Sequence, residues 1–150
     1  MTPPETSLPA RPDYVAVTYI SAPVERVWRA FTNPADQAAY FGGKTEIGEV
    51  GEGWIRHATE KWPAITGIVL AKEPPSRLLI TWGFDADPPP DRVEFLIESA
   101  ANGVTRVTIK EYHSRAWPED VTNSAVLGWS ALLAGLKTLV ETGKHLPPPF

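Results

Sequence analysis

The chain has 150 residues, a net charge of −4 and no cysteine, and these features exclude several classes of protein. A chain of this length fits one domain with a sizeable core. Without cysteine there is no disulfide framework, thiolate metal site or cysteine nucleophile. The 14 lysines and arginines are scattered, so no basic stripe is present to neutralise nucleic-acid phosphates. We therefore expect no nucleic-acid partner.

Proline marks both ends of the sequence. We expect residues 1–12 and 147–150 to be proline-rich, extended tails around a single domain over residues 13–146. The first residues lack the basic start and apolar stretch of a secretory signal, which favours a cytoplasmic location. The longest nearly apolar run, residues 125–136, is too short to cross a bilayer. We expect it to be a buried helix face.

The first elements are a strand and two short helices. Tyr14–Ile20 is rich in β-branched and aromatic residues and predicts a strand. Ser21 is a candidate N-cap for the helix that follows, which Asn33-Pro34 should end. A second short helix is expected over residues 35–41. The first helix is predicted by apolar residues at intervals of three and four: Val24, Val27, Trp28 and Phe31.

From residue 44 to 113, short β-like runs alternate with Gly, Pro, Asn and Asp, which is typical of an antiparallel meander. Val93, Phe95 and Ile97 alternate with polar residues and should face the core. Asn102-Gly103 predicts a tight hairpin turn. The expected strands are residues 45–50, 54–59, 65–72, 77–84, 92–98 and 105–113.

A long amphipathic helix is expected to close the chain, with Asp120 or Thr122 as its cap and Gly143 as its stop. Its apolar stripe consists of Ala125, Val126, Trp129, Leu132, Leu133, Leu136, Leu139 and Val140. This order of elements excludes a doubly wound parallel sheet. It predicts an α+β fold in which a curved antiparallel sheet of about six or seven strands wraps around the C-terminal helix, with two short helices after the first strand. A ligand cavity is expected between sheet and helix.

Three segments resemble the activator of heat-shock-protein-90 ATPase homologue (AHSA) branch of the START-like (SRPBCC) superfamily. Residues 21–34 resemble its strand-to-helix opening, residues 74–82 its mid-sheet segment, and residues 128–136 its closing helix. The resemblance implies a helix-grip fold with an internal cavity. The superfamily includes lipid carriers, hormone receptors and polyketide cyclases, so the fold alone names no activity. The eukaryotic activator also has a separate N-terminal domain, which we do not expect here.

Aromatic residues come from every element that should line this cavity. Such rings pack a core whether or not a ligand is present, so both interpretations stay open. Trp129 and Leu133, opposite Trp82 and Phe95, are the strongest candidates for ligand contact. The full candidate pocket consists of Phe31, Tyr40, Phe41, Trp54, His57, Trp62, Trp82, Phe84, Phe95, Tyr112, Val126, Trp129 and Leu133. Tyr40 and Phe41, beside two glycines, fit either a mobile lid or a hydrophobic plug.

The polar residues give weaker indications. If His57 faces inward, it is a polar anchor or acid/base group, and otherwise it is a solvated strand histidine. Arg56, Glu94, Glu98 and Glu111 are expected to point outward as solvated charges. The three histidines lie far apart in the sequence, and no nucleotide or hydrolase motif is present. We expect neither a metal nor a cofactor.

Three functions remain open. The main hypothesis is non-covalent binding of a small hydrophobic or amphipathic molecule between the closing helix and the sheet. The first alternative is a cyclase, dehydratase or hydrolase that uses acid/base groups such as His57 and Tyr112 in the same cavity. The second is a co-chaperone or stress-response module that binds protein through its outer surface. A homodimer and a chaperone partner are left open.

Overall fold

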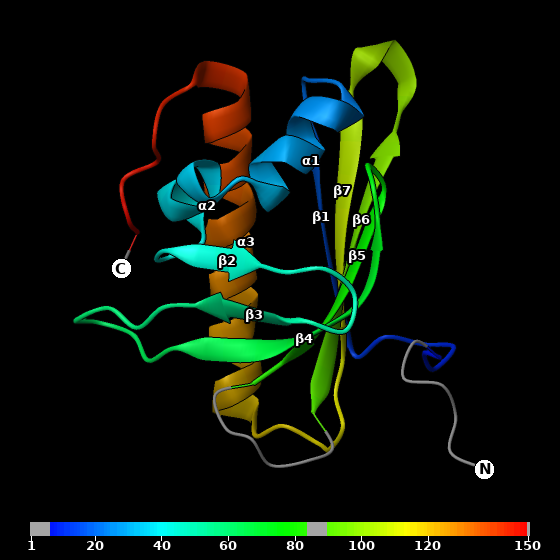
Figure 1. Ribbon diagram of the computed structural model, residues 1–150, viewed down its shortest axis with the longest axis vertical. Coiled ribbons are helices and arrows are strands. Elements are labelled where there is room, and N and C mark those ends of the chain that lie inside the picture. The colour runs from blue at the N-terminus through cyan, green and yellow to red at the C-terminus, as the bar shows by residue number, and fades with distance from the viewer. Residues whose placement is uncertain (1–6, 84–89, 150) are drawn as a thin grey trace.

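The structure is a computed structural model that describes residues 7–83 and 90–149 (Figure 1). Its elements are β1 (Tyr14–Ile20), α1 (Val24–Thr32), α2 (Pro34–Tyr40), β2 (Thr45–Ile47), β3 (Gly53–Arg56), β4 (Ile65–Glu73), β5 (Arg77–Trp82), β6 (Asp91–Ser99), η1 (Ala101–Gly103), β7 (Thr105–Tyr112) and α3 (Glu119–Thr142). The seven strands form one antiparallel sheet in the order β1-β7-β6-β5-β4-β3-β2. β1 and β2 are therefore its edges.

The sheet curves around α3. In Figure 1, α3 runs along one side of the sheet, β2, β3 and β4 cross in front of it, and α1 and α2 lie near its C-terminal half. This arrangement confirms the predicted α+β helix-grip fold: seven antiparallel strands, two short helices after β1 and a long C-terminal helix. Within the described residues, none of the helices is long and apolar enough to cross a membrane.

The helix starts differ from the sequence prediction. Pro23 is the N-cap of α1, so the predicted cap at Ser21 is wrong; the backbone N–H of Ser21 instead donates to the Glu141 carboxylate at 2.8 Å. α3 begins after Pro118, which places Asp120 in its first turn. Thr122 also lies inside the helix rather than at its cap. Proline suits both starts because it has no N–H to leave unpaired.

The predicted stops and turns are confirmed. Asn33 ends α1, and its side chain caps α2 by accepting the backbone N–H groups of residues 35 and 36. Gly143 ends α3 in the left-handed conformation, with φ of 73°. Asn102 and Gly103 form the turn between β6 and β7, both with positive φ. β2 and β3 are shorter than the expected residues 45–50 and 54–59.

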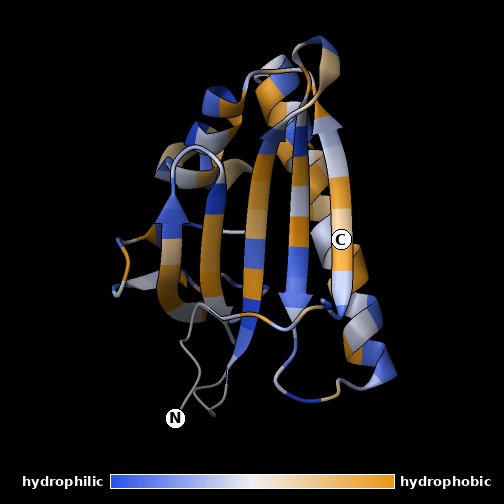
Figure 2. Ribbon diagram, turned by 90° about the vertical axis from the view of Figure 1, so that its right-hand side faces the viewer, coloured by the Kyte–Doolittle hydropathy of each residue, from blue (hydrophilic) through white to orange (hydrophobic). Residues whose placement is uncertain are grey.

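Alternate residues along each strand face α3. Figure 2, which shows the sheet from the side away from α3, makes the alternation of hydrophobic and hydrophilic residues visible along the strands. Val93, Phe95 and Ile97 of β6 are buried on the inner face as predicted, and each lies beside an inward residue of β7. The core contribution of α3 consists of Trp129, Leu132, Leu133, Leu136 and Leu139.

Candidate functional site

Aromatic rings pack directly on one another between α3 and the sheet. The ring centre of Trp82 lies 4.9 Å from that of Trp54 and 4.9 Å from that of Trp129. Phe95 lies 5.0 Å from Phe31 and 6.0 Å from Trp129. The structure thus brings together seven candidate residues in one cluster: Phe31, Tyr40, Phe41, Trp54, Trp82, Phe95 and Trp129.

Tyr40 and Phe41 are buried members of this cluster. The hydroxyl of Tyr40 donates a hydrogen bond of 2.6 Å to the backbone oxygen of Ala30. Phe41 packs against both Trp54 and Trp82. These contacts favour the hydrophobic plug over the mobile lid.

The remaining candidates lie elsewhere. Trp62 is 42% exposed in the connection between β3 and β4. Tyr112 is buried on the outer face of the sheet near Glu94, whereas Glu111, the residue before it, faces α3. Val126 is half-buried on α3. Leu133 is buried where α3 meets β1. Phe84 lies outside the described residues.

His57 does not face the interior. Trp54 and Arg56 are the inward residues at the end of β3, so the next residue points the other way. The His57 side chain is 44% exposed, and its Nε2 lies 2.5 Å from the Glu46 carboxylate. His57 is therefore a solvated strand histidine, and it does not serve as an acid/base group in the interior.

An open hollow of about 370 Å³ separates β1 from α3. We call it the β1–α3 groove; its lining consists of Tyr14, Ala16, Val17, Thr18, Ser130, Leu133, Ala134 and Lys137. Ser130 and Ala134 are one turn apart on α3, and these two small side chains leave the space open toward β1. At one end, the Lys137 ammonium donates to the backbone oxygen of Tyr19 and to Glu141, each at 2.7 Å. The groove lies between the closing helix and edge strand β1, and no member of the aromatic cluster is among its lining residues.

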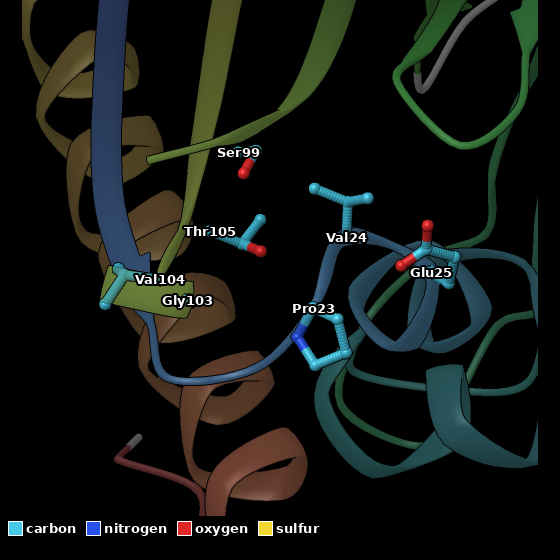
Figure 3. Close-up of a pocket in the computed structure, with 7 residues that line it drawn as sticks. All are labelled: Pro23, Val24, Glu25, Ser99, Gly103, Val104 and Thr105. Atoms are coloured by element: carbon cyan, nitrogen blue, oxygen red, sulfur yellow. The ribbon is translucent and has the colours of Figure 1, made fainter. Parts of the chain in front are cut away.

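A second hollow, of about 420 Å³, lies between the start of α1 and the β6–β7 turn (Figure 3). Its lining residues are Pro23, Val24, Glu25, Ser99, Gly103, Val104 and Thr105. It does not involve α3, and Glu25 is its one charged lining residue. It therefore lies away from the region between the closing helix and the sheet, where the ligand is expected.

Three of the four charges expected to be solvated are buried, so that prediction is wrong for Arg56, Glu94 and Glu111 and correct for Glu98. Arg56 faces inward and donates to the backbone oxygen of Pro63 at 2.6 Å. Glu94 does lie on the outer face, but the Arg77 guanidinium covers it at 2.6 Å. A buried charge needs such a partner.

Glu111 is a buried charged residue that the sequence prediction missed. Val107 and Ile109 of β7 face α3, and the same alternation turns Glu111 inward, where it is 3% exposed. This alternation was present in the sequence and could have identified the residue. The indole of Trp129 and the imidazole of His113 both favour the charged form of its carboxylate. Burial raises the pKa of Glu111, against the opposing effects of Trp129 and His113.

His113 completes the site around Glu111. Its Nε2 lies 3.7 Å from Oε1 of Glu111 and is buried without a hydrogen-bond partner. The imidazole stacks on Trp117 with ring centres 3.8 Å apart and planes within 7°. The Trp117 indole N–H donates to Asp91 at 3.1 Å, which holds that ring in place. We call Glu111, His113, Asp91, Trp117 and Trp129 the Glu111 cluster.

The Glu111 cluster adjoins the β1–α3 groove. Tyr14 lines the groove and lies directly opposite Glu111 across the β1–β7 pairing. Burial raises the pKa of Tyr14, and the negative charge of Glu111 raises it further. Within residues 7–83 and 90–149, no three His, Asp or Glu side chains are arranged to hold a metal ion. Glu111 and His113 thus lie buried beyond Tyr14, and neither residue lines the groove itself.

A curved antiparallel sheet that grips a long C-terminal helix defines the START-like class of helix-grip domains. The chain belongs to the family described as "Activator of Hsp90 ATPase homolog 1-like protein", whose model matches residues 21–141. No curated protein matches it in sequence.

Solved structures share this fold. DynU16, a protein in the dynemicin biosynthetic locus, is 25% identical with a TM-score of 0.77; the match covers 87% of this chain, which spans only 48% of DynU16. The Aha1 dimer from Colwellia psychrerythraea is 17% identical with a TM-score of 0.75, and 87% of this chain and 96% of that chain match. PFC0360w, an HSP90 activator from Plasmodium falciparum, is 16% identical with a TM-score of 0.70, covering 85% and 94% of the two chains.

Proposed function

We propose that the chain is a cytoplasmic domain that binds a small hydrophobic or amphipathic molecule in the β1–α3 groove, without covalent chemistry. The observation that carries this proposal is the open hollow of about 370 Å³ between helix and sheet. This volume falls within the range of small-molecule sites, about 300–1,000 Å³. Of the candidate pocket residues, Leu133 lines this groove.

The lining of the groove suits an amphipathic ligand. Ala16, Leu133 and Ala134 supply an apolar surface, while Ser130 and Tyr14 supply hydroxyl groups. Ligand sites combine such apolar walls with a few polar groups that fix orientation. DynU16, which shares this fold, is described as a protein in a biosynthetic locus, and this description agrees with a small-molecule role.

Blocking the groove tests this proposal. Ala134 is exposed on α3, so Ala134→Phe fills the groove without disturbing the core. Ala38→Phe places the same side chain on an exposed site of α2 and is the matched control. With the fluorescent amphipathic probe 1-anilinonaphthalene-8-sulfonate, we expect Ala134→Phe to weaken binding about tenfold, or 1.4 kcal/mol, and Ala38→Phe to change it less than about twofold. Equal affinities in the wild type and both variants would contradict the proposal.

A protein-binding role in a chaperone system is the main alternative. The family takes its name from an activator of the Hsp90 ATPase, and PFC0360w carries the description of an HSP90 activator. Such a role would use the outer surface of the domain rather than the groove. Stimulation of a heat-shock protein 90 ATPase by the wild type and by Ala134→Phe alike would favour this alternative.

An enzymatic role is the second alternative, and the structure changes the residues that would serve it. His57 is half-exposed and Tyr112 lies on the outer face, whereas Glu111 and His113 form a buried carboxyl–imidazole pair. A pair of this kind can move a proton to or from a bound molecule. Turnover of a groove ligand that Glu111→Gln abolishes without loss of binding would favour this alternative.

A further inference from the structure

We propose that Arg56 forms a binding site for an anionic group, a carboxylate or a phosphate, at the end of β3 beside the Gly42-Gly43 turn. The site is separate from the β1–α3 groove, because β3 and β1 lie near opposite edges of the sheet. The inference therefore goes beyond the proposed function. It follows from the burial of the Arg56 charge, from an unpaired nitrogen of its guanidinium and from the open surface at Gly42.

Burial is the first step. Arg56 faces inward from the end of β3 and is 9% exposed. Its cross-strand neighbours are Thr45 and Ile65, which are 0% and 4% exposed. A charge in such a place loses most of its hydration, and this loss is costly unless a partner replaces the water. The guanidinium therefore calls for a group of opposite charge.

No acidic residue of the described chain supplies that charge. In residues 7–83 and 90–149, Arg56 forms no ion pair with an aspartate or glutamate. Glu46 is on the neighbouring strand β2, but it lies opposite Ile55 and so points to the other face of the sheet. Its carboxylate contacts His57 there.

Arg77 shows how the chain neutralises another arginine. The guanidinium of Arg77 bonds to Glu73 at 2.8 Å and to Glu94 at 2.6 Å. Burial instead lowers the pKa of Arg56, and no carboxylate of the described residues opposes this effect. An anion from solution would supply the missing opposite charge.

The hydrogen bonds of the guanidinium give the second and independent step. Nη2 donates to the backbone oxygen of Pro63 at 2.6 Å, whereas Nε of Arg56 is buried without a hydrogen-bond partner. An unsatisfied buried donor of this kind calls for a bound water or ion. Water would satisfy the N–H group but leave the charge unpaired. A carboxylate or phosphate oxygen satisfies both, because charge-assisted hydrogen bonds to a guanidinium are strong.

Gly42 leaves the guanidinium accessible. It is exposed and has a positive φ of 85°. A β-carbon at Gly42 would lie 3.3 Å from Nη1 of Arg56, and apart from residues 41 and 43 no other residue has an atom within 4 Å of it. No side chain therefore covers Nη1 on this side. An anion can approach Arg56 here from the surface.

Matched six-carbon probes test the site. At pH 7 and constant ionic strength, we expect hexanoate, hexyl phosphate or both to bind the full chain at least about tenfold more tightly than 1-hexanol, as measured by isothermal titration calorimetry. The tighter of the two anions distinguishes a carboxylate site from a phosphate site. Arg56→Met removes the charge and keeps an apolar stem, so it should abolish this preference and leave hexanol affinity within about twofold. Arg29→Met, at an exposed position of α1, is the matched control and should preserve the preference.

A measurement on the wild type makes the test independent of how well Arg56→Met folds. In nuclear magnetic resonance spectra of the isotope-labelled protein, the tighter anion should shift the side-chain Nε–H signal of Arg56 and leave that of Arg29 in place. An unchanged Arg56 signal at saturating anion would contradict the inference.

The outcomes separate this site from the β1–α3 groove. If the anions bind no more tightly than hexanol, or bind Arg56→Met as tightly as the wild type, Arg56 serves only to hold the Pro63 backbone and the inference is wrong. If Ala134→Phe rather than Arg56→Met abolishes the preference, the anion lies in the groove, so the inference fails while the proposed function stands. A preference that Ala134→Phe leaves intact and Arg56→Met removes supports the inference, whether or not the groove binds a ligand.

Discussion

Tyr40 of α2 packs so closely against Gly135 of α3 that a side chain at position 135 would force one of the two helices to shift. A β-carbon at Gly135 would lie 2.9 Å from Cβ of Tyr40 and 3.5 Å from its Cα. Because Tyr40 also contacts Phe31 and Phe41, this approach sets the position of α2 against the aromatic cluster. A glycine in the middle of a long helix is otherwise unfavourable.

Gly135→Ala should therefore destabilise the protein by about 1–3 kcal/mol, because α2 has to move away from α3. Gly128 on the same helix is the matched control, since a β-carbon there meets nothing within 4 Å. Gly128→Ala should raise the free energy of unfolding by about 0.5–1 kcal/mol through helix propensity. Urea denaturation of the two variants measures the difference, and equal effects would contradict the packing described here.

Breaking the buried ion pair on the outer face should be costly. Arg77→Leu leaves the Glu94 carboxylate, which is 6% exposed, without its 2.6 Å partner. We expect a loss of about 2 kcal/mol in the free energy of unfolding, and a smaller loss when Glu94→Leu removes the other charge as well. The exposed pair of Arg106 and Glu98 is the control: Arg106→Leu should have no measurable effect on stability. Similar losses at both arginines would argue against burial as the cause.

Stability should depend on pH through Glu111. Burial raises its pKa in the folded state above the ordinary 4.5, so the folded state binds more protons than the unfolded state in the interval between the two values. The folded state therefore loses stability as the pH rises from about 4.5 through the folded pKa. Glu111→Gln removes this loss, so its stability relative to the wild type should grow with pH. Urea denaturation from pH 4 to pH 8 checks this, and a relative stability that falls with pH would contradict the assigned direction; Glu98→Gln should follow the wild type.

The arrangement of elements could be predicted from the sequence because it depends on local patterns. Alternation marked Val93, Phe95 and Ile97, and left-handed turn residues marked Asn102-Gly103, so the meander and its inward face were predicted correctly. The helix starts were wrong because serine and aspartate are good caps in general, while proline begins both α1 and α3 here. No local sequence pattern distinguishes a helix that begins at a serine or aspartate cap from one that begins at a proline.

The candidate site was predicted only in part. The aromatic residues of the interior come together as expected, because each lies on the apolar side of its own element. Glu111 was placed outside on the general rule for charges, although the alternation of β7 turns it inward. His113 and Asp91 come together only through the pairing of β6 with β7 and the path of Trp117, which the sequence does not reveal.

The position of a bound probe tests the central claim most directly. In a titration of the isotope-labelled protein with 1-anilinonaphthalene-8-sulfonate, followed by nuclear magnetic resonance, we expect the largest shifts at the groove residues Ala16, Leu133 and Ala134. Shifts confined to the outer face around Val15, Val17 and Tyr19, or to the hollow beside Val24, would contradict a ligand site between β1 and α3.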